Sequence, residues 1–400
     1  MVYYLPDHAA DKSAARKGHK LRRCYMKITV VCDVLGAENN GTTIAAMNLI
    51  RALKAKGHDV IVVCSDEDKK GKNGYVVMPQ LNLGPLNGYV KKNGVALSRA
   101  DNKVLEPVIW DSDVVHIMLP FALGRAALKL CLKHNIPVTA GFHMQAENFT
   151  SHVFMKDNPV ANNLTYRYIY NNLYKYVNAV HYPTDFIREV FENAVGHKTN
   201  AYVISNGVSD RFKPNGAKKP PEFRNKFVIL FSGRYSKEKS HSVLIDAVAL
   251  SKHSREIQLI FAGDGPLKDM LKERSKKLPN KPVFNFFPHR QMLNVLNYAD
   301  LYVHPAEIEI EAIACMEALS CGQVPIIANS PRCATKKFAL DERNLFENRN
   351  PQDLADKIDY FIEHPEAIEE YRERYKGTVA ELSQEACMNR MEEMLYEARG

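Results

Sequence analysis

Short apolar runs rich in β-branched residues alternate with longer stretches in which apolar residues recur every three to four positions. Residues 27–34 predict a buried strand, residues 43–56 a helix with one apolar face, and residues 60–64 a second buried strand. Strand, helix and strand in this order form a βαβ unit, whose strands are parallel. The same alternation continues almost to the end of the chain, so the pattern predicts an α/β protein.

The pattern also predicts the remaining elements. Strands are expected at 75–79, 113–118, 136–142, 179–182, 227–232, 258–263, 283–287, 301–303 and 324–327. Helices are expected at 121–133, 162–178, 242–250, 292–298, 311–320, 353–363, 367–375 and 379–398, and another begins after a cap at Thr184.

Turn signals near the middle of the chain indicate two domains of similar size. Asn206-Gly207 predicts a turn, and residues 214–223 contain three prolines, as a linker would. A chain of 400 residues is long enough for two domains, each with its own core. We expect a flexible extension at 1–25, domains at 26–205 and 206–378, and a terminal helix at 379–400.

Composition places the chain among soluble proteins. Hydrophobic residues make up 46% and charged residues 25%, and no apolar run approaches the roughly 20 residues that span a bilayer. The N-terminal residues lack the apolar core of a secretory signal, so we expect the protein in the cytoplasm. The eight cysteines are scattered without zinc-ligand spacing, which indicates reduced, buried thiols and no metal site.

The net charge of +8 lies entirely in the first half of the chain. Residues 1–205 carry 25 Lys and Arg against 17 Asp and Glu, whereas residues 206–400 carry 29 of each. No nucleic-acid-binding motif accompanies the charge, so we expect no nucleic-acid partner. The basic, partly apolar segment 81–106 and the tyrosine-rich segment 162–178 instead suit an anionic membrane surface. Ordinary surface structure and packing between helices are the alternative interpretations.

Glu309 and Glu317 lie eight positions apart around the predicted start of the helix at 311–320. The N–H groups at a helix N-terminus suit a phosphate, and nearby carboxylates suit the hydroxyls of a sugar and a ribose. The combination indicates a nucleotide-sugar site. Glutamates are also common in first helical turns because they favour the helix dipole, which is the alternative explanation.

Two strand ends carry further candidates. Gly233, Arg234 and Lys239 occupy a predicted strand-to-helix loop, where two cations suit a pyrophosphate, although a solvated charged loop would look similar. His143 follows the strand at 136–142, and ligands of open α/β sheets bind at such carboxyl ends. His116, inside a strand, is a weaker candidate, and Glu147 is a candidate for contact with an acceptor hydroxyl.

Residues 203–212, 231–250 and 299–328 resemble the corresponding segments of glycosyltransferase family 4, whose members are retaining enzymes of the GT-B architecture. The resemblance implies an α/β fold of two Rossmann-like domains facing across a cleft, with a C-terminal helix that crosses back to the first domain. It implies catalytic roles for His143, Arg234, Lys239 and Glu309. It implies donor binding by Gly41, Gly233, Arg234, Lys239, Gly263, Arg290, Glu309, Ile310, Glu311, Ala312, Ile313 and Glu317.

Two departures from the family pattern stand out. Ser240 replaces a usual glycine, and Ile310-Glu311-Ala312 stands where Gly-Phe-Gly is common. The second departure removes two permissive glycines and adds a carboxylate close to the expected pyrophosphate contact.

The resemblance implies retaining transfer of a hexose, from UDP-glucose or UDP-galactose, to a membrane lipid such as diacylglycerol at the inner face of the cell membrane. It implies no cofactor and no metal requirement. One alternative is a polyprenyl-linked or sugar acceptor in capsule or exopolysaccharide synthesis. Another, from a different class, is a catalytically silent GT-B binding subunit.

Overall fold

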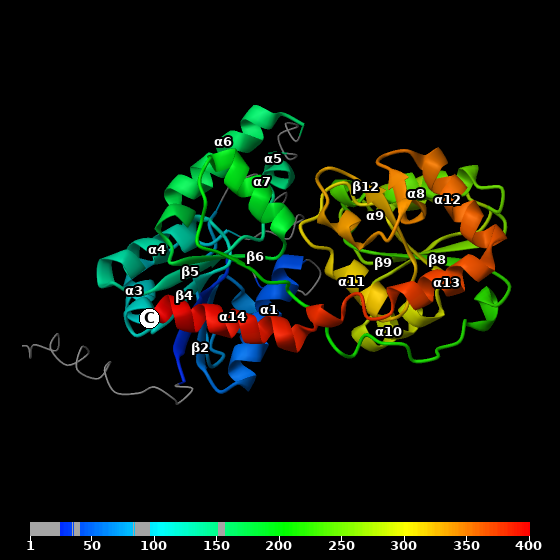
Figure 1. Ribbon diagram of the computed structural model, residues 1–400. Coiled ribbons are helices and arrows are strands. Elements are labelled where there is room, and N and C mark those ends of the chain that lie inside the picture. Colours follow the sequence, from blue (N-terminus) through cyan, green and yellow to red (C-terminus); the bar gives the residue numbers. More distant parts are fainter. Residues whose placement is uncertain (1–24, 34, 36–40, 83, 85–96, 151–156) are drawn as a thin grey trace, which may run out of the picture.

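The computed structural model describes residues 25–33, 35, 41–82, 84, 97–150 and 157–400. Residues 1–24 of the predicted extension and half of segment 81–106 lie outside these residues. The described chain forms two α/β units side by side (Figure 1).

The first unit is built on a parallel sheet of seven strands in the order β3-β2-β1-β4-β5-β6-β7. Its strands are β1 (Lys27–Val31), β2 (Asp59–Cys64), β3 (Tyr75–Val77), β4 (Val114–Ile117), β5 (Val138–Gly141), β6 (Ala179–Tyr182) and β7 (Ala201–Val203). Its helices are α1 (Gly41–Ala55), α3 (Asn102–Trp110), α4 (Ala122–His134), α5 (Ala146–Thr150), α6 (Pro159–Asn172) and α7 (Asp185–Val195).

Both faces of this sheet are buried. Val30, Val62 and Val114 belong to one apolar cluster, whereas their neighbours Val31, Val63 and Val115 belong to another. Successive side chains of a strand point to opposite faces, so two clusters from adjacent residues mean that helices cover both sides. This explains why the strands are continuous apolar runs in the sequence.

The second unit is built on a sheet of six strands in the order β10-β9-β8-β11-β12-β13. Its strands are β8 (Phe227–Ser232), β9 (Ile257–Ala262), β10 (Val283–Asn285), β11 (Leu301–His304), β12 (Pro325–Asn329) and β13 (Leu345–Glu347). Its helices are α8 (His241–Leu250), α9 (Lys268–Arg274), α10 (His289–Tyr298), α11 (Ile313–Ser320), α12 (Pro351–Glu363) and α13 (Pro365–Tyr375).

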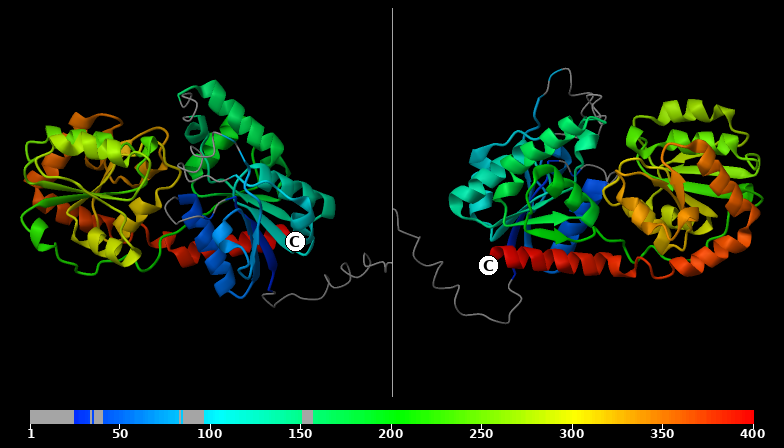
Figure 2. Two further views of the ribbon diagram at one scale, coloured as in Figure 1. Left: turned by 180° about the vertical axis from the view of Figure 1, so that it is seen from behind. Right: turned by 45° about the horizontal axis from the view of Figure 1, so that its top comes forward.

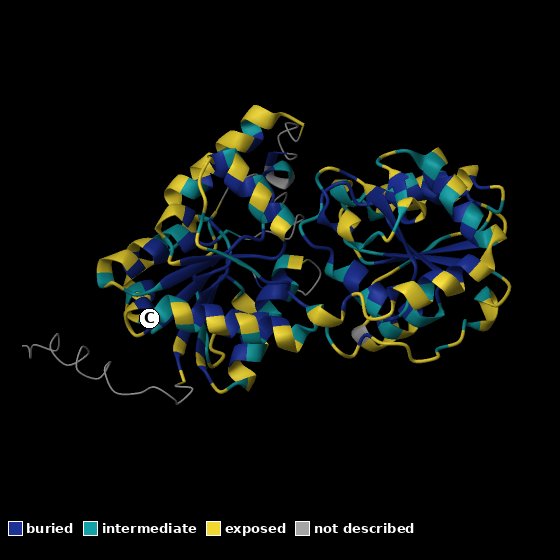
Figure 3. Cartoon of the chain, in the orientation of Figure 1, coloured by how far each residue is buried: buried dark blue, intermediate teal, exposed yellow. Residues whose placement is uncertain are grey.

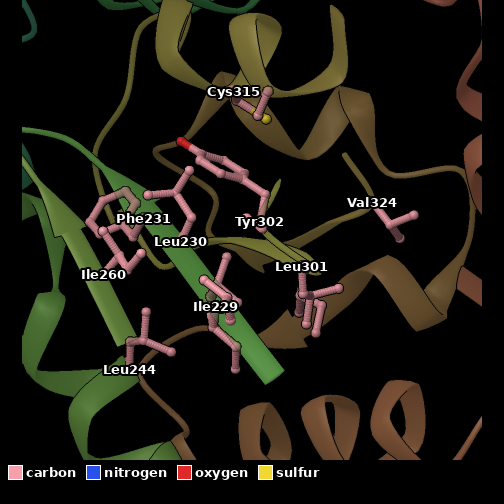
Figure 4. Close-up of a cluster of buried hydrophobic side chains, with 14 of the residues drawn as sticks. Ile229, Leu230, Phe231, Leu244, Ile260, Leu301, Tyr302, Cys315 and Val324 are labelled. Carbon is pink, nitrogen blue, oxygen red and sulfur yellow. The ribbon is translucent and has the colours of Figure 1, made fainter. Parts of the chain in front are cut away.

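The centre of the second unit lies between β8 and β11. Figure 4 shows Leu230 and Phe231 of β8 beside Tyr302 of β11, and all three are fully buried. Burying side chains of this size contributes on the order of 2 kcal/mol each. The carboxyl ends of β8 and β11 are therefore held in fixed positions, and these ends carry the loops of the candidate site.

The chain passes between the two units twice, near Val208 and again near residues 382–384, and these two segments are hydrogen-bonded to each other. Val208 N donates to Leu382 O and Gln384 N donates to Val208 O, both at 2.8 Å. Gly207 has φ +76°, and a Cβ there would lie 2.6 Å from the Cα of Gln384. After the second passage, α14 (Gln384–Arg399) lies across the first unit (Figures 1 and 2).

Helix α14 completes the core of the first unit. Met388, Met391 and Leu395 are buried in the same cluster as Val30. The buried Glu392 is bonded by Lys56 Nζ at 2.6 Å and by His58 Nε2 at 2.9 Å. This confirms the predicted arrangement of two Rossmann-like units with a terminal helix crossing back. The predicted boundary at 205/206 falls between β7 and β8.

Several element boundaries differ from the predictions. The helix expected at 311–320 begins at Ile313, because Ala312 has a left-handed backbone with φ +67°. The helix expected at 162–178 ends at Asn172, and a short 3₁₀ turn, η5 (Tyr174–Tyr176), follows. The helix expected at 379–398 divides into a 3₁₀ turn, η11 (Ala380–Leu382), and α14. The elements α3, α9, β7 and β13 were not predicted.

Within the described residues, no helix combines the length and the apolar character needed to cross a membrane.

Candidate active site

The loop after β8 places two cations at the carboxyl end of the central strands. It runs from Gly233 through the 3₁₀ turn η7 (Lys237–Lys239) to Ser240, which has φ +51°. Gly263 packs behind it, because a Cβ at Gly263 would lie 2.1 Å from the carbonyl oxygen of Gly233. A residue with a side chain would therefore displace the loop, so Gly263 acts by allowing the close contact with Gly233.

Lys239 and Glu309 form the central ion pair of the site, joining the β8 loop to the loop after β11. The His304 Nε2 atom lies 3.7 Å from Glu309 Oε2. Burial opposes ionisation of Glu309, but Lys239 and His304 outweigh it and lower its pKa to about 2. Burial likewise opposes the charge of Lys239, yet Glu309 raises its pKa. Both side chains are therefore ionised at neutral pH.

Arg234 adds a second cation to the same loop. Its side chain is half-buried, and burial lowers its pKa, although an arginine keeps its charge at any physiological pH. The loop is held by Tyr235, whose hydroxyl donates to Phe261 O at 2.7 Å. The β8 loop thus carries two cations of the site, which suits a phosphate ligand.

Glu317 lies about one turn into α11, as predicted. Burial raises its pKa to about 8, with Arg211 opposing the rise. Among the described residues, no donor forms a hydrogen bond with its carboxylate. A half-buried carboxyl group without a donor suits a ligand that brings hydroxyl donors.

Residues 310–312 contact the first unit rather than an open site. Thr184 Oγ1 donates to Ile310 O at 2.9 Å, and the Ile310 side chain packs against the core of the first unit. The Glu311 carboxylate accepts hydrogen bonds from Asn206 N, at 3.1 Å, and from Asn206 Nδ2. Burial raises the pKa of Glu311 to about 7, against these hydrogen bonds. The carboxylate expected near the donor is therefore engaged at the first passage between units, and Ala312 leads from there into Ile313, the first residue of α11.

His143 follows β5 at the edge of the first unit and is buried. Its ring lies back over Gly141, where a Cβ would meet His143 Nε2 at 2.6 Å. Burial holds the pKa of His143 well below its usual range, so the ring is neutral. Thr42 Oγ1, near the start of α1, donates to His143 O at 3.4 Å. A neutral imidazole can hydrogen-bond a sugar hydroxyl without adding charge.

The other predicted residues take different positions. His116 is buried within β4, where its Nδ1 atom bonds Thr139 Oγ1 at 2.8 Å. Gly41 is the first residue of α1, and Arg290 is exposed in the first turn of α10. Glu147 lies in the short helix α5, where the Tyr166 hydroxyl donates to its Oε2 atom at 3.0 Å.

Sequence reasoning missed a charge cluster that joins the two units. Arg332 pairs with Asp157 of the first unit at 2.6 Å and with the buried Glu307 at 3.3 Å. Arg349 also pairs with Glu307. The partners are far apart in the sequence and form no spaced motif, so only the folded structure reveals the cluster.

In the part of the chain that the structure describes, no group of three or more His, Cys, Asp or Glu side chains is arranged to hold a metal ion.

Two family models match consecutive parts of the chain. "Glycosyltransferase Family 4" matches residues 39–212, and "Glycosyl transferases group 1" matches residues 212–378. Together they span both units and the site between them. The chain belongs to this glycosyltransferase family.

The chain is also similar to individual proteins of known sequence or structure. Alpha-monoglucosyldiacylglycerol synthase of Acholeplasma laidlawii is 23% identical over 370 residues, 86% of this chain and 90% of that protein. The catalytic domain of cholesterol-alpha-glucosyltransferase from Helicobacter pylori is 45% identical, covering 41% of this chain and 98% of its own, with a TM-score of 0.36. Anabaena Alr3699/HepE in complex with UDP-glucose is 17% identical, covering 94% and 100% of the two chains with a TM-score of 0.69, and shares the GT-B fold.

In this member of the glycosyltransferase family, the candidate site residues lie where the two GT-B domains meet. Lys239, Glu309 and Glu317 come from the second domain and His143 from the first. The loops at the carboxyl ends of both parallel sheets therefore contribute residues to the candidate site. This is where ligands generally bind in α/β sheets.

Proposed function

We propose that this protein is a retaining glycosyltransferase that moves a hexose from UDP-glucose or UDP-galactose to the hydroxyl group of a membrane lipid such as diacylglycerol. The observation that carries the proposal is the half-buried Lys239–Glu309 pair, whose lysine is on the same loop as Arg234, at the carboxyl ends of β8 and β11. Membership of the glycosyltransferase family and similarity to a monoglucosyldiacylglycerol synthase support it.

In this proposal, the cations of the β8 loop bind the donor's phosphates. Departure of the nucleotide places negative charge on the β-phosphate. Arg234, Lys239 and the N-terminus of α11 stabilise that charge from fixed positions, which is the largest source of catalysis in many enzymes. The ion pair with Glu309 keeps Lys239 charged and oriented while the site is empty.

The carboxylates and the histidine orient the rest of the donor. Glu317 binds the ribose hydroxyls, Glu309 contacts the hexose, and the neutral His143 contacts the same hexose from the first domain. The leaving phosphate takes the acceptor's proton, so no metal and no separate base enters the reaction. Approach of the two domains excludes water and limits hydrolysis of the donor.

A surface of the first domain supports association with an anionic membrane at the inner face of the cell membrane. Lys129 and Lys133 of α4 are exposed, as are Leu132 of α4 and Tyr168 of α6. Tyr168 receives a hydrogen bond of 3.0 Å from Arg125 of α4, which links the two helices. Basic side chains among exposed apolar ones are typical of surfaces that bind anionic lipid.

The alternative acceptors remain a polyprenyl-linked lipid or a sugar in polysaccharide synthesis. The alternative from another class is a silent binding subunit. The ionised pair at Lys239 and the unsatisfied carboxyl group of Glu317 favour an active donor site over a silent one.

Product analysis tests the proposal directly. The purified protein is incubated with UDP- and GDP-sugars and a lipid extract, and mass spectrometry and NMR identify the product and its anomeric configuration. We expect an α-linked hexosyl lipid, because these donors carry an α-linked hexose.

The matched variants are Arg234→Ala and Arg255→Ala. Loss of Arg234 is expected to lower kcat about a hundredfold, because it removes stabilisation of the leaving phosphate. Arg255 is exposed on the same domain, and its loss is expected to change nothing. Wild-type turnover by the Arg234→Ala variant would contradict the assignment.

A further inference from the structure

We propose that the acceptor presents an uncharged, hydroxyl-bearing head group to a pocket between the two domains, where Glu147 positions the hydroxyl. The inference rests on the proposed function and deepens it by locating the acceptor and giving its charge. Glu147 acts as a positioning residue that holds the hydroxyl before transfer.

The pocket has a volume of about 190 Å³ and is lined by both domains. Glu147, Asn163, Tyr166 and Val190 come from the first domain, and Arg332 comes from the second. A site of this size suits a small polar head group and not a whole lipid.

The pocket adjoins the groups assigned to the donor's hexose. Gln145 lies between His143 and Glu147 in the sequence, and its Nε2 atom donates to Arg332 O at 3.2 Å. The same carbonyl oxygen accepts from Glu309 N at 3.2 Å. A group in the pocket is therefore next to the edge of the site that bears His143 and Glu309.

Glu147 is oriented to receive a hydroxyl. Ala146 N donates to the Tyr166 oxygen at 3.1 Å, and the Tyr166 hydroxyl in turn donates to Glu147 Oε2 at 3.0 Å. Tyr166 is only 1% exposed, so this chain of hydrogen bonds is rigid. The Glu147 Oε1 atom receives no hydrogen bond from any residue that the structure describes, which leaves it for a ligand.

The charges around the pocket discriminate between the possible acceptors. Asp157 and Glu147 both line it, and Arg332, the cation among its described lining residues, is paired with Asp157 and with Glu307. An anionic phosphate or diphosphate would meet carboxylates here and a cation that already has partners. A neutral hydroxyl meets a carboxylate that accepts its hydrogen bond, which is favourable.

An apolar path leads from the pocket to the surface. Pro159 lines the pocket at the first turn of α6. The next apolar residues along that helix, Val160 and Leu164, are 64% and 61% exposed. Lipid chains attached to the bound head group can follow this face of α6 towards a membrane, and Figure 3 shows how exposed the helix is.

The experiment compares neutral and anionic acceptors without assuming which lipid is used. A total lipid extract of the source cells is separated by anion exchange into a neutral fraction, which includes diacylglycerol and sterols, and an anionic fraction, which includes polyprenyl phosphates. Each fraction is incubated in detergent micelles with the wild-type protein and radiolabelled UDP-glucose or UDP-galactose. We expect label in the neutral fraction.

The variants are Glu147→Gln and, as a matched control, Glu189→Gln on the surface of α7. Glu147→Gln is expected to lower kcat/KM for the neutral lipid at least tenfold, while the KM for the donor stays within twofold of the wild-type value. Tyr166→Phe is expected to give a smaller loss of the same kind, because it leaves the carboxylate without its donor. The control is expected to match wild type.

Each outcome is decisive. Label in the anionic fraction, or unchanged transfer by Glu147→Gln, overturns the inference while the donor site stands. Donor hydrolysis without label in either fraction overturns both the inference and the lipid acceptor. Absence of donor binding and hydrolysis by the wild-type protein shows instead that the proposed function itself is wrong.

Discussion

Ser240 and Ala312 occupy backbone conformations that glycine adopts more easily. Their φ angles are +51° and +67°, and each immediately precedes a helix of the candidate site. Left-handed conformations cost a residue with a Cβ about 1–2 kcal/mol. Both are positions where the sequence departs from the glycines common in the family. The backbone thus keeps the left-handed conformation that suits glycine, although Ser240 and Ala312 make it energetically less favourable.

If Glu317 binds the ribose hydroxyls, as proposed, nucleotide binding depends on pH. Its pKa of about 8 in the free protein means that the carboxyl group is largely protonated at pH 7. Ribose hydroxyls donate to the ionised form, so binding lowers this pKa and releases a proton below pH 8. We expect the affinity for UDP to rise several-fold between pH 6.5 and pH 8.5.

Calorimetric titration in buffers of different ionisation enthalpy measures that proton release. The Glu317→Gln variant is expected to bind UDP more weakly and to lose the extra proton release near pH 8. An affinity that rises equally in wild type and variant would assign the pH dependence to another group.

At the scale of single residues, the sequence indicated candidate charged side chains at strand ends but did not predict their contacts. Arg234, Lys239, Glu309 and Glu317 stand out because charged residues follow apolar strands. The pairing of Lys239 with Glu309 depends on β8 and β11 being neighbours, which spacing along the chain does not determine. The partner of Glu311 was missed for the same reason, because Asn206 lies 105 residues away in the sequence, at the first passage between the domains.

At the scale of elements, the passage at Ser205–Gly207 is fixed to the loop before α11. The Glu311 carboxylate accepts hydrogen bonds from the backbone and side-chain amides of Asn206, and the two residues are buried together. Burial disfavours the charged form of this carboxylate more than its hydrogen bonds and Lys337 favour it. The junction between the domains therefore contains a group whose charge opposes folding.

The pKa of Glu311 gives this junction a pH-dependent stability. Its pKa is about 7 in the folded protein, against an ordinary value of 4.5. The stabilisation from the protonated form is complete below pH 4.5 and is lost as the pH rises through 7. We expect Glu311→Gln to raise the thermal midpoint by about 2–4 °C at pH 8 and to have little effect at pH 5.

Scanning calorimetry at the two pH values checks this expectation. Glu311→Ala, which removes the acceptor altogether, is expected to lower the midpoint at both. A Glu311→Gln shift of equal size at pH 5 and pH 8 would show that ionisation of this residue is not responsible.

The strands were predictable because burial on both faces makes each of them a continuous apolar run. Helix α3 was missed because Pro107 lies inside it and only Leu105 and Ile109 are buried, so its apolar face is short. The strands β7 and β13 have only three residues each and lie at sheet edges, where little apolar periodicity is needed.

At the scale of the whole molecule, exposed apolar residues gather on neighbouring helices of the first domain. Val104 and Trp110 lie on α3, Leu132 on α4, and Leu164 and Tyr168 on α6, each at least 44% exposed. A groove of about 460 Å³ between α3 and α4 contains Lys129 and Lys133. Lys133 is paired with Glu106, which also lines the groove, whereas Lys129 is an exposed basic residue beside these apolar side chains.

Liposome flotation tests whether this surface binds a membrane. We expect the protein to float with vesicles containing phosphatidylglycerol at low salt and to be released as salt is raised. Lys129→Glu is expected to weaken binding about thirtyfold, since each basic residue contributes about 1 kcal/mol and the reversal removes one charge and adds a repulsive one. Lys272→Glu on α9 of the second domain is the control. Equal losses in both variants would place the contact elsewhere.

The return of α14 to the first domain has a consequence for synthesis on the ribosome. The core that α14 completes contains strands made from residues 27–117, yet Met388, Met391 and Leu395 are translated more than 270 residues later. The second domain has all its strands and helices once residue 375 has emerged. Although domains usually fold in the order of their synthesis, here the domain that is begun first is finished last. Until α14 has been synthesised, the apolar surface beside α1 remains uncovered. A chaperone could bind the hydrophobic residues exposed there.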